Sequence, residues 1–236
     1  MTDFIRDFDG RQYFSVWRRE YPAAAVETAL RYGINALELA HVTTENRNFY
    51  DVLSDWKFVE HFRVLDFEKR PLDKVHELTR LRTLYLEDNC ACACDPRVFP
   101  HLVKLIVEWY ESRYLCLSHP ALQNLCIYEF KPKEPISIDL PQLEKLSVFG
   151  TNIVSLAAWD GCSNLKRIRI TRARKFTDLA SLRNFPQLED VWLQETPLVT
   201  EFEILNELPN LKIARLAEAG RLPQDATFRP DIQVYR

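Results

Sequence analysis

Leucine recurs along this chain at an interval that few folds can accommodate. The pattern L-x-x-L-x-L, in which other apolar residues replace some leucines, begins at residues 34, 62, 81, 102, 122, 143, 165, 188 and 211. From residue 62 onward the starts are 19 to 23 residues apart, and only the first interval, of 28 residues, is longer. Repeats of this length and motif indicate a stacked array in which each unit adds one strand to a parallel sheet.

The spacing within the motif predicts which side chains are buried. In a short strand the residues at motif positions 4 and 6 point into the core, whereas positions 3 and 5 point to the open face of the sheet. We place positions 7 and 8 on the open face as well. The leucines at position 4, such as Leu84, Leu105, Leu125 and Leu146, are therefore expected to be buried.

From about residue 34 to 219 the chain resembles leucine-rich-repeat proteins of the short-repeat, internalin-like subclass. The resemblance implies an α/β solenoid, a horseshoe with about nine parallel strands, and says little about function. One departure concerns motif position 9, where the family has an asparagine. Only Asn89 keeps it; the other units have Val42, Arg70, Tyr110, Phe130, Thr151, Ala173, Thr196 and Ala219 there. Smooth curvature is therefore less firmly expected.

Both ends of the array need caps, because a terminal repeat would otherwise expose its core. Residues 1–33 are expected to form an N-terminal cap with a helix between Pro22 and Gly33 and a strand in "RQYFSVW". Residues 34–219 are the repeats, and residues 220–236 form a C-terminal cap in which "RPDIQVYR" is a last strand. The sequence thus predicts a single domain, 1–236.

Net charge and hydrophobicity limit the partners and the cellular location that can be expected for the chain. A net charge of -3 argues against bulk nucleic-acid binding, and no apolar run reaches the roughly 20 residues that span a membrane. The N-terminus is acidic and polar, unlike a secretion signal. We therefore expect a bacterial cytoplasmic protein, a monomer, with no membrane or nucleic-acid partner. The basic stretch at 166–175 does not change this, because Ile168 and Ile170 alternate with its arginines at strand period.

Three cysteines stand at alternate positions in the turn that follows the repeat at 81, namely Cys90, Cys92 and Cys94. In an extended segment such side chains lie about 6.5–7 Å apart, which is too far for a disulfide. Packing of small apolar side chains in the turn is the favoured interpretation. A metal site or a redox sensor is the alternative function, although no second cysteine pair stands at ligand spacing.

Signals of catalysis are missing from the sequence. It contains no H-E-x-x-H, no G-x-S-x-G and no Walker loop, and its five glycines are widely separated. The histidines are expected to be structural, apart from His41 on the open face. We therefore predict no enzyme activity and no cofactor.

The open face is where function is expected. Its earlier units present mostly acidic side chains and its later units mostly basic ones, with large aromatic residues among them. Such residues dominate binding energies at interfaces. We predict a non-enzymatic module that binds a folded protein partner, in a toxin-neutralising (immunity) or regulatory role. The predicted contact residues are Glu68, Tyr85, Glu87, Ile106, Glu108, Trp109, Tyr128, Phe149, Arg169, Arg172, Trp192 and Arg215.

Overall fold

The computed structural model describes residues 4–17, 23–40, 53–65, 73–87, 95–109, 116–223 and 225–236. The chain divides into two compact units, Met1–Glu108 (unit 1) and Trp109–Arg236 (unit 2). In the described part of the chain, no helix is long and apolar enough to cross a membrane.

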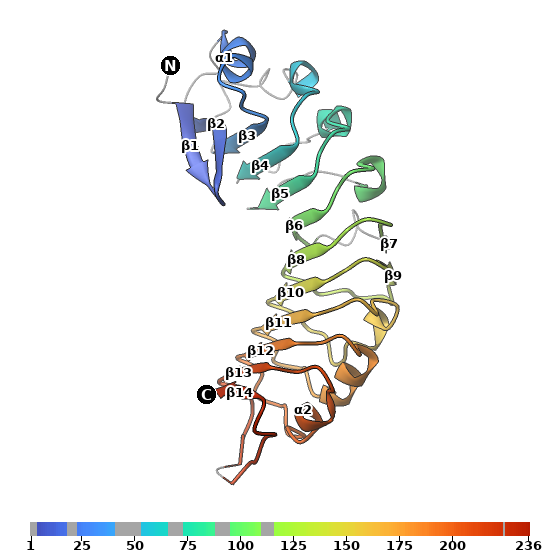
Figure 1. Cartoon of the computed structure of the whole chain (residues 1–236). Helices are drawn as coiled ribbons and strands as arrows, with labels where there is room; N and C mark the ends of the chain where they lie inside the picture. The colour runs from blue at the N-terminus through green and yellow to red at the C-terminus, as the bar shows by residue number, and fades with distance from the viewer. Residues whose placement is uncertain are drawn as a thin grey trace. The chain divides into compact units, whose positions relative to one another are not determined.

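Unit 1 is built on a sheet whose strands follow the chain order (Figure 1). Its strands are β1 (Ile5–Phe8), β2 (Arg11–Trp17), β3 (Ala36–Ala40), β4 (His61–Leu65), β5 (Thr83–Glu87) and β6 (Lys104–Glu108). Strand β1 pairs with β2 antiparallel, and all the later pairings are parallel. The returning segments contain α1 (Ala25–Arg31), η3 (Asp73–Glu77) and η4 (Pro96–Val98). Helix α1 lies inside the predicted range.

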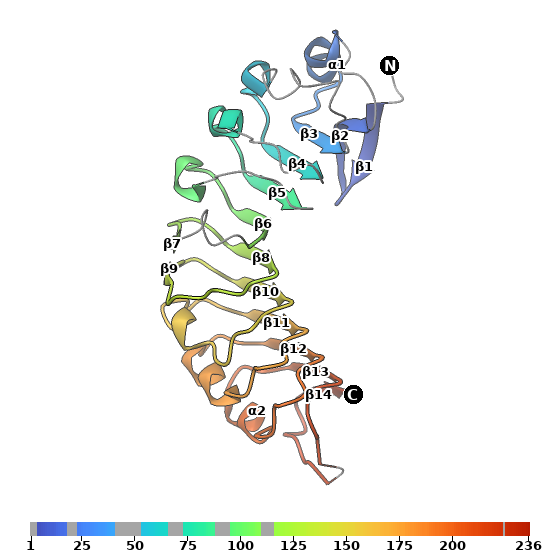
Figure 2. The ribbon, with the colours of Figure 1, turned by 180° about the vertical axis from the view of Figure 1, so that it is seen from behind.

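Unit 2 repeats the same plan with shorter returning segments. Its parallel strands are β8 (Asn124–Tyr128), β10 (Lys145–Phe149), β11 (Arg167–Thr171), β12 (Asp190–Gln194), β13 (Ile213–Ala217) and β14 (Gln233–Tyr235). Behind them lie β7 (Cys116–Ser118) paired with β9 (Ser137–Asp139), and η5 (Ala157–Trp159), η6 (Leu179–Asn184) and α2 (Ile204–Glu207). Figures 1 and 2 show the strands along one side of this ribbon and the helical turns along the other. The solenoid predicted from the sequence is therefore observed, and β2 and β14 add to the strands that the motifs predict.

The alternation within the motif is confirmed by burial. Leu105 and Val107 of β6 are buried, whereas Ile106 between them is half-buried. The same alternation recurs in β8, β10, β12 and β13. Each of these strands thus contributes two apolar side chains to the core of its unit.

The motif that we placed at residue 62 is out of frame by three residues. Phe62 pairs with Leu37 and with Leu84, which both occupy motif position 4, so this repeat begins at Val59. The first two intervals are then 59 − 34 = 25 and 81 − 59 = 22 residues. The sequence was ambiguous here because apolar residues stand at positions 1, 4 and 6 in either frame.

In the repeats of unit 2 whose position 9 the structure describes, this position is buried although it holds no asparagine; its residues are Phe130, Thr151, Ala173, Thr196 and Ala219. At one of these positions a threonine makes the contacts between neighbouring repeats. The Thr151 hydroxyl donates to the Phe130 carbonyl (2.6 Å) and accepts from the Ile153 amide (3.1 Å). At three of the other positions, Phe130, Ala173 and Ala219, a buried apolar side chain stands in place of the asparagine.

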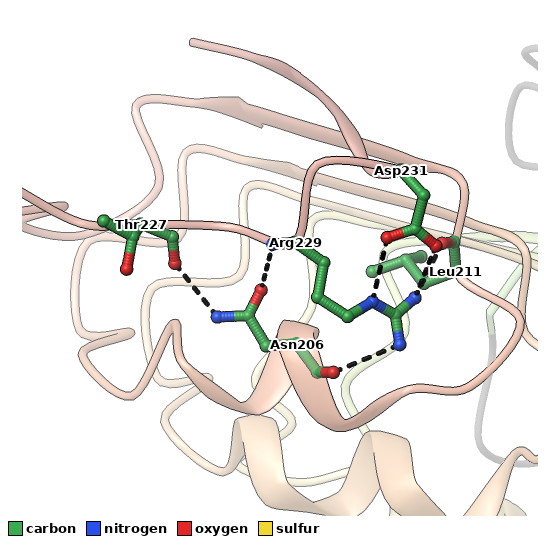
Figure 3. Close-up of polar contacts among 5 residues, drawn as sticks. All are labelled: Asn206, Leu211, Thr227, Arg229 and Asp231. Atoms are coloured by element: carbon green, nitrogen blue, oxygen red, sulfur yellow. Dashed lines mark hydrogen bonds and ion pairs between the residues drawn. The ribbon is translucent and has the colours of Figure 1, made fainter.

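The end of unit 2 is fastened by one asparagine and one arginine (Figure 3). The Asn206 side chain donates to the Thr227 carbonyl (2.9 Å) and accepts from the Arg229 amide (2.8 Å). The Arg229 guanidinium donates back to the carbonyls of Asn206 (3.2 Å) and Leu211 (3.3 Å), and it pairs with Asp231. These contacts hold the segment that leads into β14 against α2.

We expect Asn206→Ala to lower the free energy of unfolding by about 1–2 kcal/mol, because it removes two hydrogen bonds to backbone groups at once. Urea unfolding followed by circular dichroism measures the change. Asn184→Ala is the matched control, since the Asn184 side chain is exposed and makes no hydrogen bond to a described residue. Equal stability of the Asn206 variant and the parent would show that the segment is held by other contacts.

Candidate functional site

The open face of unit 1 is covered by the chain's own N-terminal hairpin. The turn of that hairpin, Asp9–Gly10, has left-handed backbone angles (φ 51° and 72°) that bring Phe8 and Asp9 over the sheet. The Phe8 ring packs edge-on against Tyr85 (5.7 Å), and the Arg63 guanidinium lies 4.0 Å from the Phe8 ring centre. The Asp9 carboxylate accepts hydrogen bonds from the Tyr85 hydroxyl and from Lys104 Nζ, both at 2.8 Å.

Tyr85 is therefore buried, with 2% of its surface exposed, and the prediction that it faces solvent is wrong. The hydrogen bonds from Lys104 and Tyr85 hold the pKa of the Asp9 carboxyl below its usual range. The dipeptide Asp9–Gly10 is a strong hairpin signal that our reading of the sequence did not use.

Much of the acidic charge expected in unit 1 is not on an open surface. Glu38 is buried, forms an ion pair with Arg63 (2.7 Å) and accepts from the Ser15 hydroxyl (2.6 Å). Glu68 and the Glu87 side chain lie outside the described residues. The remaining predicted contact residues of this unit, Ile106 and Glu108, are half-buried on β6.

Trp109, at motif position 8, was predicted to lie on the open face, and this prediction is wrong. It is 6% exposed, and its ring packs edge-on against Phe130 (4.9 Å), which in turn packs against Trp159 (5.9 Å). Phe130 occupies the place of the family's asparagine, so an apolar contact has replaced a polar one. These three rings form an aromatic cluster in the core of unit 2.

The backbone explains why Trp109 differs from the other residues at motif position 8. In an extended chain position 8 points to the same side as positions 4 and 6, into the core. In five repeats of unit 2 the residue at position 8 does not point into the core, because its backbone has a left-handed conformation (φ 52° to 62°). These residues are Glu129, Gly150, Arg172, Glu195 and Glu218. Trp109 does not have a positive φ, and its side chain continues inward.

Unit 2 carries a continuous stack of aromatic and arginine side chains on its open face. We call it the aromatic–arginine row; it consists of Tyr128, Phe149, Arg169, Trp192, Arg215 and Tyr235. The rings of Tyr128 and Phe149 stack at 5.0 Å with an interplanar angle of 19°. The Arg169 guanidinium carbon then lies 4.9 Å from the centre of Phe149 and 3.7 Å from the centre of Trp192.

The row continues to the last strand through a second arginine. The Arg215 guanidinium carbon lies 5.7 Å from Trp192 and 5.6 Å from Tyr235, which is 47% exposed. The inner members of the row are half-buried, so one side of the stack meets solvent. Tyr235 was missed by the sequence reasoning, because the repeat pattern was not extended into the last strand.

The two arginines of the row differ in their charge pairing. Arg215 forms an ion pair with Asp190. Arg169 makes no ion pair or hydrogen bond with any described residue, and its Nε is buried without an acceptor. Its two Nη nitrogens are not buried, and they also lack a partner among the described residues.

The surroundings of Arg169 are basic. Lys145, Arg167 and the predicted contact residue Arg172 are exposed on β10, on β11 and just after it, and none has an ion-pair partner in the described part of the chain. The acidic side chains of Glu195 and Glu218 lie at position 8 of the two later repeats. Excess positive charge is therefore concentrated on two neighbouring strands.

The cysteine alternative finds no support among the described residues. Cys90, Cys92 and Cys94 lie outside them, and within them no three histidine, cysteine or acidic side chains are grouped to hold a metal ion. Cys126 is half-buried on β8. Burial raises the pKa of the Cys162 thiol to about 11, so it is not a reactive thiolate at neutral pH.

No family model matches the sequence, and a comparison with curated proteins finds none that is similar. Among solved structures, the internalin InlF of Listeria monocytogenes has a TM-score of 0.60 at 16% identity, over 94% of this chain and 66% of that one. Toll, in its complex with Spätzle from Drosophila, has a TM-score of 0.52 at 16% identity, over 94% of this chain and 33% of that one.

Internalin C2 of Listeria monocytogenes has a TM-score of 0.47 at 17% identity, over 86% of this chain and 79% of that one. The chain thus spans just under two thirds of InlF and a third of Toll. Together with the parallel strands described above, the likenesses to InlF and Toll establish an internalin-like leucine-rich-repeat fold.

Proposed function

We propose that this protein is a non-enzymatic module that binds a folded protein partner on the open face of unit 2. The observation that carries the proposal is the aromatic–arginine row, which runs across the strands with one side in solvent. Tryptophan, tyrosine and arginine contribute most to binding energies at protein interfaces. The complex of Toll with Spätzle is an instance of a leucine-rich-repeat fold bound to a protein.

The row is suited to this use because its members are held in place before a partner arrives. Each side chain is stacked on at least one neighbour in the row, so little conformational freedom remains to be lost on association. The open face of unit 1 offers a partner fewer contact groups, because the N-terminal hairpin already binds Tyr85 and Lys104 there. We therefore place the partner on unit 2.

Removal of the Trp192 ring is the direct test of this surface. We expect Trp192→Ala to weaken binding at least tenfold, mainly through faster dissociation, because the ring supports both arginines of the row. The partner is first captured from the cells of origin on immobilised wild-type protein, identified, and purified. Its affinity for each variant is then measured by calorimetry.

Leu198→Ala is the matched control, since Leu198 is 52% exposed in unit 2 but lies beyond the end of β12, away from the row. Equal affinity of the Trp192 variant and the wild type would contradict the proposal, as would the absence of any captured protein. The activity of the captured protein, measured with and without this chain, then distinguishes a neutralising or regulatory role from a scaffolding role. A partner that loses activity when bound indicates toxin neutralisation or regulation, and one that does not indicates a scaffold.

A further inference from the structure

We propose, building on the function above, that Arg169 binds a carboxylate that the partner presents from a loop, so that the partner's surface is acidic at this point. The proposal names the chemistry of the contact and the residue that makes it. It rests on three features of unit 2: the fixed position of Arg169, its missing counterion, and the charge around it.

Arg169 is held in place by two aromatic rings. Its guanidinium lies between the Phe149 and Trp192 rings, at 4.9 Å and 3.7 Å from their centres. The buried Nε marks the inner end of the group, and the two Nη nitrogens meet solvent. A guanidinium can donate two parallel hydrogen bonds to one carboxylate, and here contact with two rings restricts its movement before a partner binds.

The missing counterion distinguishes Arg169 from its neighbour in the same row. Arg215 stands at the same motif position two strands away and is paired with Asp190. The strand register places Ser147 and Trp192 beside Arg169, and neither carries a carboxylate. The half-buried guanidinium has therefore lost part of its hydration without gaining an acceptor from the described residues, which favours an acceptor from outside.

The charge around Arg169 adds long-range attraction for an acidic surface. Lys145, Arg167 and Arg172 are exposed nearby and have no ion-pair partner among the described residues. Complementary charge speeds the encounter between proteins and orients them before contact. A partner with a basic surface would be repelled at the same strands.

Unit 1 shows that a carboxylate on a loop can bind to the open face of this sheet. There Asp9, at the turn of a hairpin, accepts from the Tyr85 hydroxyl and from Lys104 Nζ. Phe8 beside it packs on Tyr85 and on the Arg63 guanidinium. The occupant of that face is thus an acidic and aromatic turn, and it meets the same residue types that unit 2 leaves open.

A single-stranded nucleic acid would fit this face less well than an acidic protein. Bases bind to such proteins by stacking on the flat faces of aromatic rings. In the row these faces are already used: Phe149 lies between Tyr128 and Arg169, and Trp192 lies between Arg169 and Arg215.

The test uses the full chain and defined probes. A fluorescein-labelled peptide of twelve residues in which glutamate alternates with serine is titrated by fluorescence anisotropy at low salt. A peptide with lysine in place of glutamate and a twelve-nucleotide oligothymidine serve as comparison probes. The variants are Arg169→Gln, which removes the charge, and Arg169→Lys, which keeps it but loses the planar fork. Arg174→Gln is the matched control, because Arg174 is exposed in the same repeat and has no ion-pair partner in the described part of the chain.

We expect the glutamate peptide to bind the wild type more tightly than either comparison probe. Arg169→Gln should weaken this binding at least tenfold and Arg169→Lys several-fold, whereas Arg174→Gln should change it less than twofold. Should Arg169→Gln lower the melting temperature strongly, the Arg169→Lys variant decides. Equal losses for Arg169→Gln and Arg174→Gln would overturn the proposal, because the binding would then reflect general charge. No binding of the glutamate peptide, or tighter binding of oligothymidine, would overturn it as well.

The affinity of the captured partner for the variants distinguishes failure of this inference from failure of the proposed function. A partner that binds Arg169→Gln as tightly as the wild type, yet binds Trp192→Ala weakly, would disprove the carboxylate contact and leave the proposed function standing. Absence of any captured protein would count against the proposed function whatever the peptide titration shows.

Discussion

Trp109→Ala is expected to lower the free energy of unfolding by about 3–5 kcal/mol, because it removes a large ring from a buried cluster and leaves a cavity. The ring packs against Phe130, which packs against Trp159, and both of these neighbours are almost completely buried. Unfolding in urea, followed by circular dichroism in the far ultraviolet, measures the loss. Tryptophan fluorescence is not suitable because the variant itself changes the signal.

Trp192→Ala is the matched comparison, since it deletes the same side chain from the open face of the same unit. Its cost should be about 1 kcal/mol, because a half-buried ring leaves no cavity. If the two variants are equally stable, Trp109 is not a core residue, and its assignment to the open face would have to be restored.

The motif was sufficient to predict the fold because its apolar positions have only one consistent arrangement over most of the chain. From residue 81 onward the assigned frame of each repeat places leucine, isoleucine or valine at nearly every inward position. Shifting that frame by one residue would bury charged side chains. Around residue 62 the same argument fails, since Val59, Phe62 and Val64 satisfy the motif as well as Phe62, Leu65 and Phe67. The pairing of Phe62 with Leu84 decides between them.

The open face was harder to predict because its exposure depends on contacts distant in sequence. Tyr85 stands at motif position 5, as expected, but Asp9 covers it from 76 residues away. Repeat periodicity contains no information about such a contact. The prediction for Trp109 failed for a local reason. A side chain at position 8 reaches the open face only when the residue has a left-handed backbone conformation, which four non-glycine residues of unit 2 adopt. Side chains of this kind rarely take that conformation, and nothing in the motif indicates it.

Apart from Trp109, the contact residues predicted in unit 2 lie where the sequence placed them, unlike Tyr85 of unit 1. Tyr128, Phe149, Arg169, Trp192 and Arg215 all lie on the open face, because the frame of these repeats was correct. Their stacking into one row follows from strand register, which places Arg169 beside Trp192 and Trp192 beside Arg215. The ion pair of Arg215 could not be predicted, nor could the lack of an ion-pair partner for Arg169 among the described residues, since both depend on side-chain conformation.

His61 is expected to make unit 1 sensitive to mild acid. It is 6% exposed at the start of β4, and its Nδ1 is buried without a hydrogen bond to a described residue. Burial lowers the pKa of His61 to about 4, and the positive charges of Arg11 and Arg82 act in the same direction against the opposing charges of Glu60 and Asp9. The unfolded chain, with an ordinary pKa near 6.5, therefore binds a proton between pH 6.5 and 4 that the folded chain does not.

The stability that depends on neutral His61 is thus fully present above pH 6.5 and is lost as the pH falls toward 4. From pH 7 to pH 5 the loss should be about 2 kcal/mol. Urea unfolding at the two pH values, for the wild type and for His61→Leu, measures it; the variant should lose much less, because leucine does not titrate. His101→Gln is the matched control, since His101 is exposed and should leave the wild-type profile unchanged. The carboxyl of Asp9 does not interfere in this range, because its pKa lies below the ordinary value of 3.8. An equal loss in the wild type and in His61→Leu would mean that another group titrates, and the buried ring of His61 would then have to be accessible to protons without unfolding.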